Sequence, residues 1–196
     1  MGTKRVSNAR TRFRHPTTSN TVEMMIRAAL PNDVPILVQL IRDLAAYERA
    51  LDEVRITEEV LGEALFAPEP GLFARVAVSG DDVLGMALYH RNFSTWTGTA
   101  GIYLEDLYVR PDHRGRGVGR SLLVELARLA VQMDWRRVEW SVLDWNESAI
   151  EFYRSIGAVA MDEWTRYRLA GDALRDFAGA SEVDESPLGN DQRMTP

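Results

Sequence analysis

The stretch LEDLYVRPDHRGRGVGRSLL, residues 104–123, joins an apolar strand, a segment rich in glycine and arginine, and the start of a helix. Its strand part carries two adjacent carboxylates, Glu105 and Asp106. Glycines let a chain turn sharply and let a ligand come close to the backbone. The free N–H groups and partial positive charge of a helix N-terminus favour an anion. The stretch therefore predicts a phosphate or pyrophosphate site at the start of this helix.

Two familiar phosphate-binding loops do not fit this spacing. The dinucleotide-binding fingerprint requires a third glycine at the position of Arg120. A P-loop requires Gly-Lys followed by Ser or Thr, whereas the chain has Gly119, Arg120 and Ser121. The structural alternative is a glycine-rich strand-to-helix turn on a basic surface, with no ligand.

The composition is that of an ordinary globular protein, with 45% hydrophobic and 27% charged residues in a chain of 196. The absence of cysteine excludes disulfides, thiolate metal sites and a cysteine nucleophile. The three histidines show no metal-ligand spacing, so we expect no metal. A net charge of −6 argues against general nucleic-acid binding. With no membrane-length apolar run and no leader pattern, we expect a cytoplasmic protein with neither nucleic acid nor membrane as partner.

Both ends of the chain differ in composition from its middle. Residues 1–22 carry five positive charges and no acid, and residues 179–196 are polar, acidic and rich in turn formers. We expect a disordered basic tail, one domain over residues 23–178, and a disordered acidic tail. A nucleic-acid or transit arm is the functional alternative for the first tail, and a solvated extension is favoured.

The pattern of apolar residues between the tails predicts a mixed α/β domain. A hairpin is expected around Gly80, and residues 100–109, apolar on both faces apart from the two carboxylates, are expected in the middle of the sheet. Thr57 is expected to cap a short helix, and Gly157 to end the last one. The expected strands are 23–29, 73–80, 83–90, 100–109, 137–143 and 163–170, and the other expected helices are 31–49, 117–133 and 147–156.

Residues 114–119, Arg-Gly-Arg-Gly-Val-Gly, resemble the pyrophosphate loop of the GNAT N-acetyltransferases. The resemblance spans about residues 24–170 and is strongest to the spermidine/spermine and thialysine branch. It rests also on LAAYE (44–48), FSTWTG (93–98), YLEDLYV (103–109), VLDWNESA (142–149), FYRSIGA (152–158) and Trp164. It implies an α/β GNAT fold whose central mixed, mostly antiparallel sheet has about six to seven strands flanked by helices. It further implies acetyl-CoA as donor, a small primary amine as acceptor, and a homodimer.

The resemblance assigns the donor side of the site to two segments. The strand residues Leu107, Tyr108 and Val109 are expected to meet the pantetheine arm and the acetyl carbonyl. The other residues expected at coenzyme A are Arg114, Gly115, Arg116, Gly117, Val118, Gly119, Arg120, Asn146 and Ser148. Asn146 is also expected to cap the helix that follows it.

Two residues are predicted to move protons. The resemblance assigns proton removal from the amine, through water, to Glu105, and the general acid for the departing thiolate to Tyr153. Because neighbouring strand residues alternate, we expect Glu105 and Asp106 to face opposite sides of the sheet. A salt-bridged strand carboxylate is the alternative for Glu105 and Asp106 alike. Helical periodicity alone would make Tyr153 a core aromatic.

Aromatic faces and carboxylates suit an ammonium ligand. The resemblance implies that the amine meets Tyr47, Glu48, Trp96, Asp106, Asp162, Glu163 and Trp164. The polyamine enzymes tend to carry an aspartate just before the tryptophan, whereas this chain has Ser94 and Thr95 before Trp96. We therefore expect an acceptor resembling thialysine or another lysine analogue in preference to spermidine.

Three other functions are compatible with parts of the sequence. A non-catalytic sensor of coenzyme A would need the donor loop, but not Glu105 and Tyr153 together. A protein or peptide N-acetyltransferase would share the whole donor half. A nucleic-acid-binding module would use the Arg-Gly segment and the basic tail, which the net charge disfavours.

Overall fold

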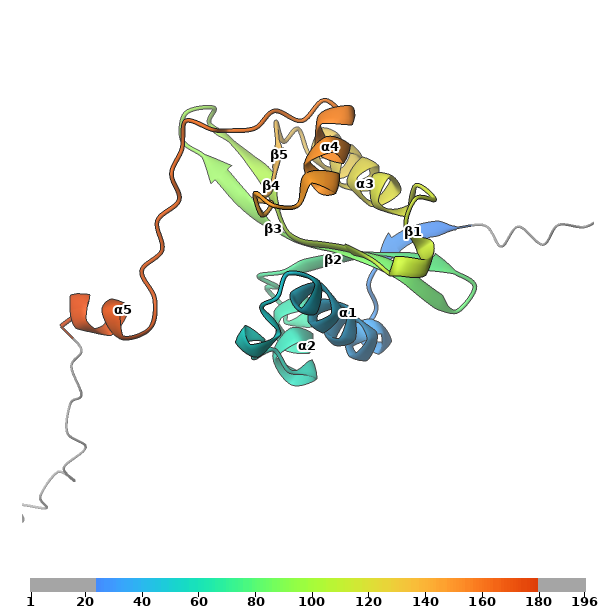
Figure 1. Cartoon of the computed structure of the whole chain (residues 1–196), viewed down its shortest axis with the longest axis horizontal. Helices are drawn as coiled ribbons and strands as arrows, with labels where there is room; N and C mark the ends of the chain where they lie inside the picture. Colours follow the sequence, from blue (N-terminus) through green and yellow to red (C-terminus); the bar gives the residue numbers. More distant parts are fainter. Residues whose placement is uncertain (1–23, 180–196) are drawn as a thin grey trace, which may run out of the picture. The chain divides into compact units, whose positions relative to one another are not determined.

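The computed structural model describes residues 24–179 (Figure 1). The chain falls into two compact units that divide between Ser141 and Val142. The predictions for the two tails concern residues outside the described range, with the exception of Gly179.

The first unit is built on a five-stranded sheet whose strands lie in chain order. The strands are β1 (Met25–Ala28), β2 (Phe73–Ser79), β3 (Asp82–Ser94), β4 (Thr99–Val109) and β5 (Val138–Glu139). The first three pairings are antiparallel and the β4–β5 pairing is parallel. The mixed, mostly antiparallel sheet is as expected, with fewer strands than the predicted six to seven.

The helices of this unit follow the predicted pattern. They are η1 (Pro31–Asp33), α1 (Val34–Tyr47), η2 (Leu51–Glu53), α2 (Glu58–Phe66), η3 (Pro111–His113) and α3 (Val118–Gln132). Thr57 caps α2 as predicted, because its Oγ1 accepts the N–H of Val60 at 3.2 Å. Gly80, with φ of 61°, turns β2 into β3.

Helices cover both faces of the sheet, with α1 and α2 on one side and α3 on the other (Figure 1). Leu37 and Leu40 of α1 are fully buried and pack with Met86 and Leu88 of β3. Leu122 and Leu126 of α3 are also fully buried. Because both faces are covered, β3 and β4 are apolar on both sides. The middle strand is β3, whereas β4, which was expected there, is the fourth strand and pairs with β5 only at Ile102 and Tyr103.

The second unit contains α4 (Glu147–Ser155) and α5 (Gly171–Phe177). Asn146 caps α4 as predicted, since its side chain accepts the N–H of Ala149. Gly157 follows the helix with φ of 86°, the left-handed geometry predicted for it.

Two strand predictions need correction. Residues 163–170 form no strand, and of the predicted strand 137–143 only Val138 and Glu139 pair in the sheet. Alternation of apolar and polar residues predicts a strand only if a neighbouring edge is there to pair with it, and the local sequence does not contain that edge.

Candidate functional site

A β-bulge interrupts β4 at its first carboxylate. Leu104 pairs with Tyr89, and Asp106 pairs with Leu88, so Glu105 stands between two adjacent pairs without a partner of its own. A bulge adds one residue to one strand, which reverses the alternation of side chains beyond that residue.

The bulge corrects the expectation that the two carboxylates face opposite sides. Partners across a ladder share a face, so Asp106 lies with Leu88 on the α1 side, whereas Leu104 lies with Tyr89 on the α3 side. Glu105 also reaches the α1 side, because its Oε2 lies 3.9 Å from Nε2 of His90, two residues beyond Leu88. The side chains of Glu105 and Asp106 therefore lie on the same face of the sheet.

A third carboxylate joins them from the end of α1. Glu48 follows the last residue of α1, and burial raises the pKa of its carboxyl. The pKa of Asp106 is raised to about 6, first by burial and then by the negative charges of Glu105 and Glu48. We call Glu48, Glu105 and Asp106 the carboxylate cluster. A cluster of this kind gains stability when a cation enters it.

Sequence reasoning missed His90 as a neighbour of this cluster. Its ring lies 5.2 Å from the ring of Tyr103, centroid to centroid, and its Nε2 approaches Glu105. The contact between His90 and Glu105 depends on how β3 and β4 are aligned in the hairpin. The alternation of apolar and polar residues along each strand does not specify that alignment. A prediction of the bulge would have been needed to place His90 and both carboxylates on one face.

The edge of β4 that faces away from β3 is open beyond the cluster. Pairing with β5 is limited to Ile102 and Tyr103 among the described strands. The N–H of Arg110 donates to the carbonyl of Leu84 on β3, at 3.0 Å. Because the direction of N–H groups alternates along a strand, those of Leu107 and Val109 point to the open edge. This edge offers backbone donors to an extended ligand.

The glycine-rich loop leads from this edge into α3. Gly115 and Gly117 have φ of 71° and 82°, in the left-handed region that favours glycine. Gly117 occupies the N-cap of α3, where no side chain bonds the first N–H groups. Ser121 makes the first bond of the helix, to the carbonyl of Gly117, so the N–H groups before it are available. This loop fits the pyrophosphate expected there.

The three arginines of this segment differ in their surroundings. All three are exposed, and no contact of the Arg116 or Arg120 side chain is described. Arg114 instead places its guanidinium against the rings of Tyr47 and Tyr108, and its Nε donates to the carbonyl of Val109 at 2.9 Å. These contacts bring Tyr47, at the end of α1, next to the loop.

Trp96 lies in the turn between β3 and β4 and is 86% exposed. The six steps of strand from Thr99 to Glu105 span roughly 20 Å, so Trp96 is not beside the carboxylate cluster. The remaining predicted residues belong to the second unit. Asn146 and Ser148 lie at the start of α4, Tyr153 lies within it, and Asp162, Glu163 and Trp164 lie in a turn closed by the N–H of Trp164 and the carbonyl of Met161.

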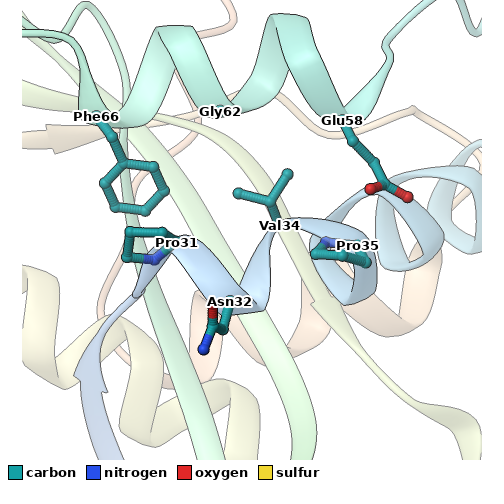
Figure 2. Close-up of a pocket in the computed structure, with 7 residues that line it drawn as sticks. All are labelled: Pro31, Asn32, Val34, Pro35, Glu58, Gly62 and Phe66. Carbon is teal, nitrogen blue, oxygen red and sulfur yellow. The ribbon is translucent and has the colours of Figure 1, made fainter.

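A groove of about 550 Å³ lies at the other end of α1, where η1 and α1 meet α2 (Figure 2). It is lined by Pro31, Asn32, Val34, Pro35, Glu58, Gly62 and Phe66. It lies at the start of the 14-residue α1, whereas Glu48 follows the last residue of that helix. Glu58 is its one ionisable side chain, so it lacks the paired groups that a proton-transfer site requires.

Neither a membrane-spanning helix nor a metal-binding group is found within the described residues, 24–179. No helix in this range is long and apolar enough to cross a bilayer. No group of three or more histidine, aspartate or glutamate side chains in the same range is arranged to hold a metal ion.

Known proteins similar to this chain share its fold and its sequence over most of its length. It is 37% identical over 167 residues to the thialysine N-epsilon-acetyltransferase of Bos taurus, covering 80% of this chain and 98% of that protein. It is 32% identical to an L-ornithine N5-acetyltransferase of Arabidopsis thaliana, covering 82% and 91%. An integron cassette protein from the mobile metagenome of V. cholerae has the same fold, with a TM-score of 0.67 and 30% identity over 79% of this chain and 97% of that one.

The model of the acetyltransferase (GNAT) family matches residues 37–158. That range includes the carboxylate cluster, the open edge of β4, the glycine-rich loop and α4. The expected family and fold class are thereby confirmed, and the chain is a member of the GNAT family, an acetyl-CoA-dependent N-acetyltransferase that acts on an amine.

Proposed function

We propose that this enzyme acetylates the terminal amine of a small amino acid, with thialysine, lysine or ornithine analogues preferred over spermidine. The observation that carries the proposal is the carboxylate cluster on one face of β4. The outer edge of the same strand and the loop that follows it suit the acetyl-CoA donor. The names of the relatives agree with it, since they acetylate thialysine and L-ornithine. Ser94 and Thr95 stand where the polyamine enzymes tend to have an aspartate before the tryptophan, which supports the same ranking.

The proposed binding of acetyl-CoA rests on the backbone N–H groups at the open edge of β4 and at the start of α3. Acetyl-CoA supplies an acetyl group activated as a thioester. The residues proposed to hold it are Leu107, Tyr108, Val109, Arg114, Gly115, Arg116, Gly117, Val118, Gly119, Arg120, Asn146 and Ser148. The open-edge N–H groups of Leu107 and Val109 are donors for the negative charge that develops on the carbonyl oxygen.

The acceptor enters as a cation and must lose a proton. An alkylammonium group has a pKa near 10.4, so about one molecule in a thousand is a free base at neutral pH. Asp106 and Glu48 attract the ammonium group, and the ring of Tyr47 offers it an aromatic face. Glu105 accepts the proton, through water, as the amine attacks directly within a ternary complex.

The other assignments rest on the family resemblance. Tyr153, on α4, is proposed to protonate the departing thiolate. Asp162, Glu163 and Trp164 are proposed to contact the rest of the acceptor. Trp96, which the resemblance also implied, lies roughly 20 Å along the strand from the carboxylate cluster and is left out of this proposal. We also expect a homodimer in the cytoplasm, with neither nucleic acid nor membrane as partner and no metal in the reaction.

The proposal is tested by thiol release from acetyl-CoA with thialysine, lysine, ornithine, spermidine, putrescine and a short peptide. We expect the highest kcat/KM with an amino acid that carries a terminal amine. Tyr153→Phe should lower kcat about 100-fold, whereas Tyr167→Phe, the same change at a residue outside the proposed site, should not. Preference for spermidine would overturn the ranking. Acetyl-CoA binding without turnover of any amine would favour a sensor, and turnover of the peptide alone would favour a protein acceptor.

A further inference from the structure

The side chain of Arg114 turns toward the acceptor side of the site. Its guanidinium carbon lies 5.1 Å from the ring centroid of Tyr47 and 5.3 Å from that of Tyr108. Both distances are within the range of a cation–π interaction. Its Nε donates to the carbonyl of Val109 at 2.9 Å, which fixes the base of the guanidinium group.

These three contacts connect three parts of the first unit. Tyr47 is the last residue of α1, Tyr108 and Val109 belong to β4, and Arg114 begins the glycine-rich segment. Tyr108 is 5% exposed and packs in the core under α1, so it provides a fixed surface for the guanidinium. Tyr47 is 39% exposed and depends more on its partners for its position.

An arginine suits this position better than a lysine. The guanidinium is planar, so it can face aromatic rings while an N–H in its plane donates to a carbonyl. A lysine ammonium is a strongly hydrated point charge that lacks this geometry. The flanking Gly115, with φ of 71°, gives the chain the turn that separates this side chain from the rest of the loop.

We propose that Arg114 is a positioning residue that couples the donor loop to the acceptor site by holding Tyr47. The inference rests on the proposed function, because it takes Tyr47 as a contact of the amine. Arg114 contacts Tyr47 in the free protein, and the donor strengthens this contact by ordering the loop further, so the amine binds the donor complex more tightly than the free enzyme. By linkage, the amine strengthens donor binding by the same factor.

The backbone and side chain of Arg114 then have separate tasks. The backbone belongs to the glycine-rich loop on the donor side, while the guanidinium acts on Tyr47. The competing assignment is a guanidinium that leaves the tyrosines to bind a phosphate. The two assignments differ in which substrate is affected when the side chain is removed.

The first experiment does not depend on any activity. Backbone hydrogen exchange is measured in the free protein for residues 44–49 and 110–117, in wild type, Arg114→Ala, Arg114→Lys and the control Arg128→Ala. Arg128 is an exposed arginine on α3 outside the proposed site. We expect faster exchange in both segments for the two Arg114 variants alone. Unchanged exchange at residues 44–49 would overturn the inference, even if the wild type acetylates no amine.

The second experiment separates the two substrates. With thialysine as acceptor and saturating acetyl-CoA, Arg114→Ala should raise the KM for the amine about fivefold with little change in kcat, the size expected for a lost cation–π contact. In calorimetry, the tighter binding of thialysine in the presence of coenzyme A should disappear. Weaker acetyl-CoA binding with an unchanged KM for thialysine would instead support the phosphate contact and overturn the coupling.

A mutant cycle tests whether Arg114 acts through Tyr47. Tyr47→Leu alone should raise the KM for thialysine, and adding Arg114→Ala should raise it no further. Independent roles would make the two effects multiply, which would overturn the inference. Arg114→Lys keeps the positive charge and disturbs the loop less than Arg114→Ala. If the charge alone matters, this variant should restore the KM for thialysine. If Arg114 positions Tyr47, the KM should stay raised.

Discussion

The two ends of α1 treat buried charge in opposite ways. At its start, Asp33 accepts hydrogen bonds from both terminal guanidinium nitrogens of Arg27, at 2.6 and 3.0 Å, and from the N–H of Leu30 at 2.7 Å. At its end, Glu48 lies near Asp106 and Glu105, and the charges that act on Asp106 are negative. Asp33 is thus neutralised by a neighbouring cation, whereas the charges that act on Asp106 have its own sign.

The pKa values of the two aspartates record this difference. The hydrogen bonds from Arg27 hold the pKa of Asp33 below its usual value, whereas burial and two carboxylates raise the pKa of Asp106 to about 6. A paired carboxylate stabilises the fold, while a carboxylate left among like charges is relieved only by a proton or by a cationic ligand. The start of α1 is therefore expected to control stability, and its end to control catalysis.

The largest effect is expected from Glu105. Glu105→Gln removes the proposed proton acceptor and should lower kcat about 100-fold, because general base catalysis contributes at least that much. The melting temperature should stay close to that of the wild type, since Glu105 is exposed. Steady-state kinetics and thermal unfolding check this, with Glu59→Gln on α2 as the control. A normal kcat in Glu105→Gln would show that the carboxylate near the end of α1 is not the proton acceptor.

The converse effect is expected at the other end of the helix. Asp33→Asn leaves Arg27 without its partner and should cost about 2 kcal/mol of unfolding free energy in urea denaturation, with normal kcat per folded molecule. Because the folded pKa of Asp33 is lowered, its stabilisation is complete above 3.8 and is lost as the pH falls below that value. Asp43→Asn, on the same helix, is the control, because its carboxylate accepts only an exposed hydrogen bond from Gln39 among the contacts described. Equal losses in both variants would refute the special role of the Arg27–Asp33 pair.

Much of this fold is predictable because local patterns decide it. The spacing of Leu37 and Leu40 predicts the buried face of α1, and Thr57 and Gly157 mark helix ends through their own backbone and side-chain chemistry. The apolar residues on both faces of β4 predict that helices cover both of its sides, although its place next to the short β5 is not predicted by them. Each of these features depends on residues close together in the chain.

The relation between Glu105 and Asp106 was not predictable in the same way. One inserted residue in the ladder places both carboxylates on one face, and nothing in the letters LED signals that insertion. Arg114 likewise carries the residue type of an anion ligand but contacts two tyrosines from other elements. Such features depend on how strands pair and helices pack, so composition and periodicity do not contain them.

A smaller effect, with a distinct pH dependence, is expected from Asp106. Its folded pKa is raised, so its contribution to stability is most favourable below 3.8, declines as the pH rises toward about 6, and is constant above that. Asp106→Asn should therefore gain on the order of 2 kcal/mol of stability at pH 7.5 relative to the wild type, with less gain at pH 5. Melting curves at several pH values check this. A variant that is less stable at pH 7.5 would show that Asp106 has a favourable partner.

The same substitution should weaken binding of the amine. The ionised form of Asp106 attracts an ammonium group, so the KM of the wild type should fall as the pH rises through about 6. Asp106→Asn should remove that dependence and raise the KM about tenfold at pH 7.5, the loss expected for one charge-assisted contact. An unchanged pH profile of KM in the variant would assign the titration to another group.

The smallest effect is expected from Glu48. Its size relative to that of Glu105 shows how strongly each carboxylate raises the pKa of Asp106. Of the three causes that raise the pKa of Asp106, burial is the largest, the charge of Glu105 is the second and the charge of Glu48 is the third. Glu48→Gln should therefore lower the titration midpoint of Asp106, by less than Glu105→Gln does, and neither variant should restore the ordinary value of 3.8 because burial persists. Carbon-13 NMR of the aspartate carboxyl groups, assigned with Asp106→Asn, measures the midpoints. A midpoint that rises in Glu48→Gln would mean that Glu48 orients a donor toward Asp106, and the end of α1 would then resemble its start.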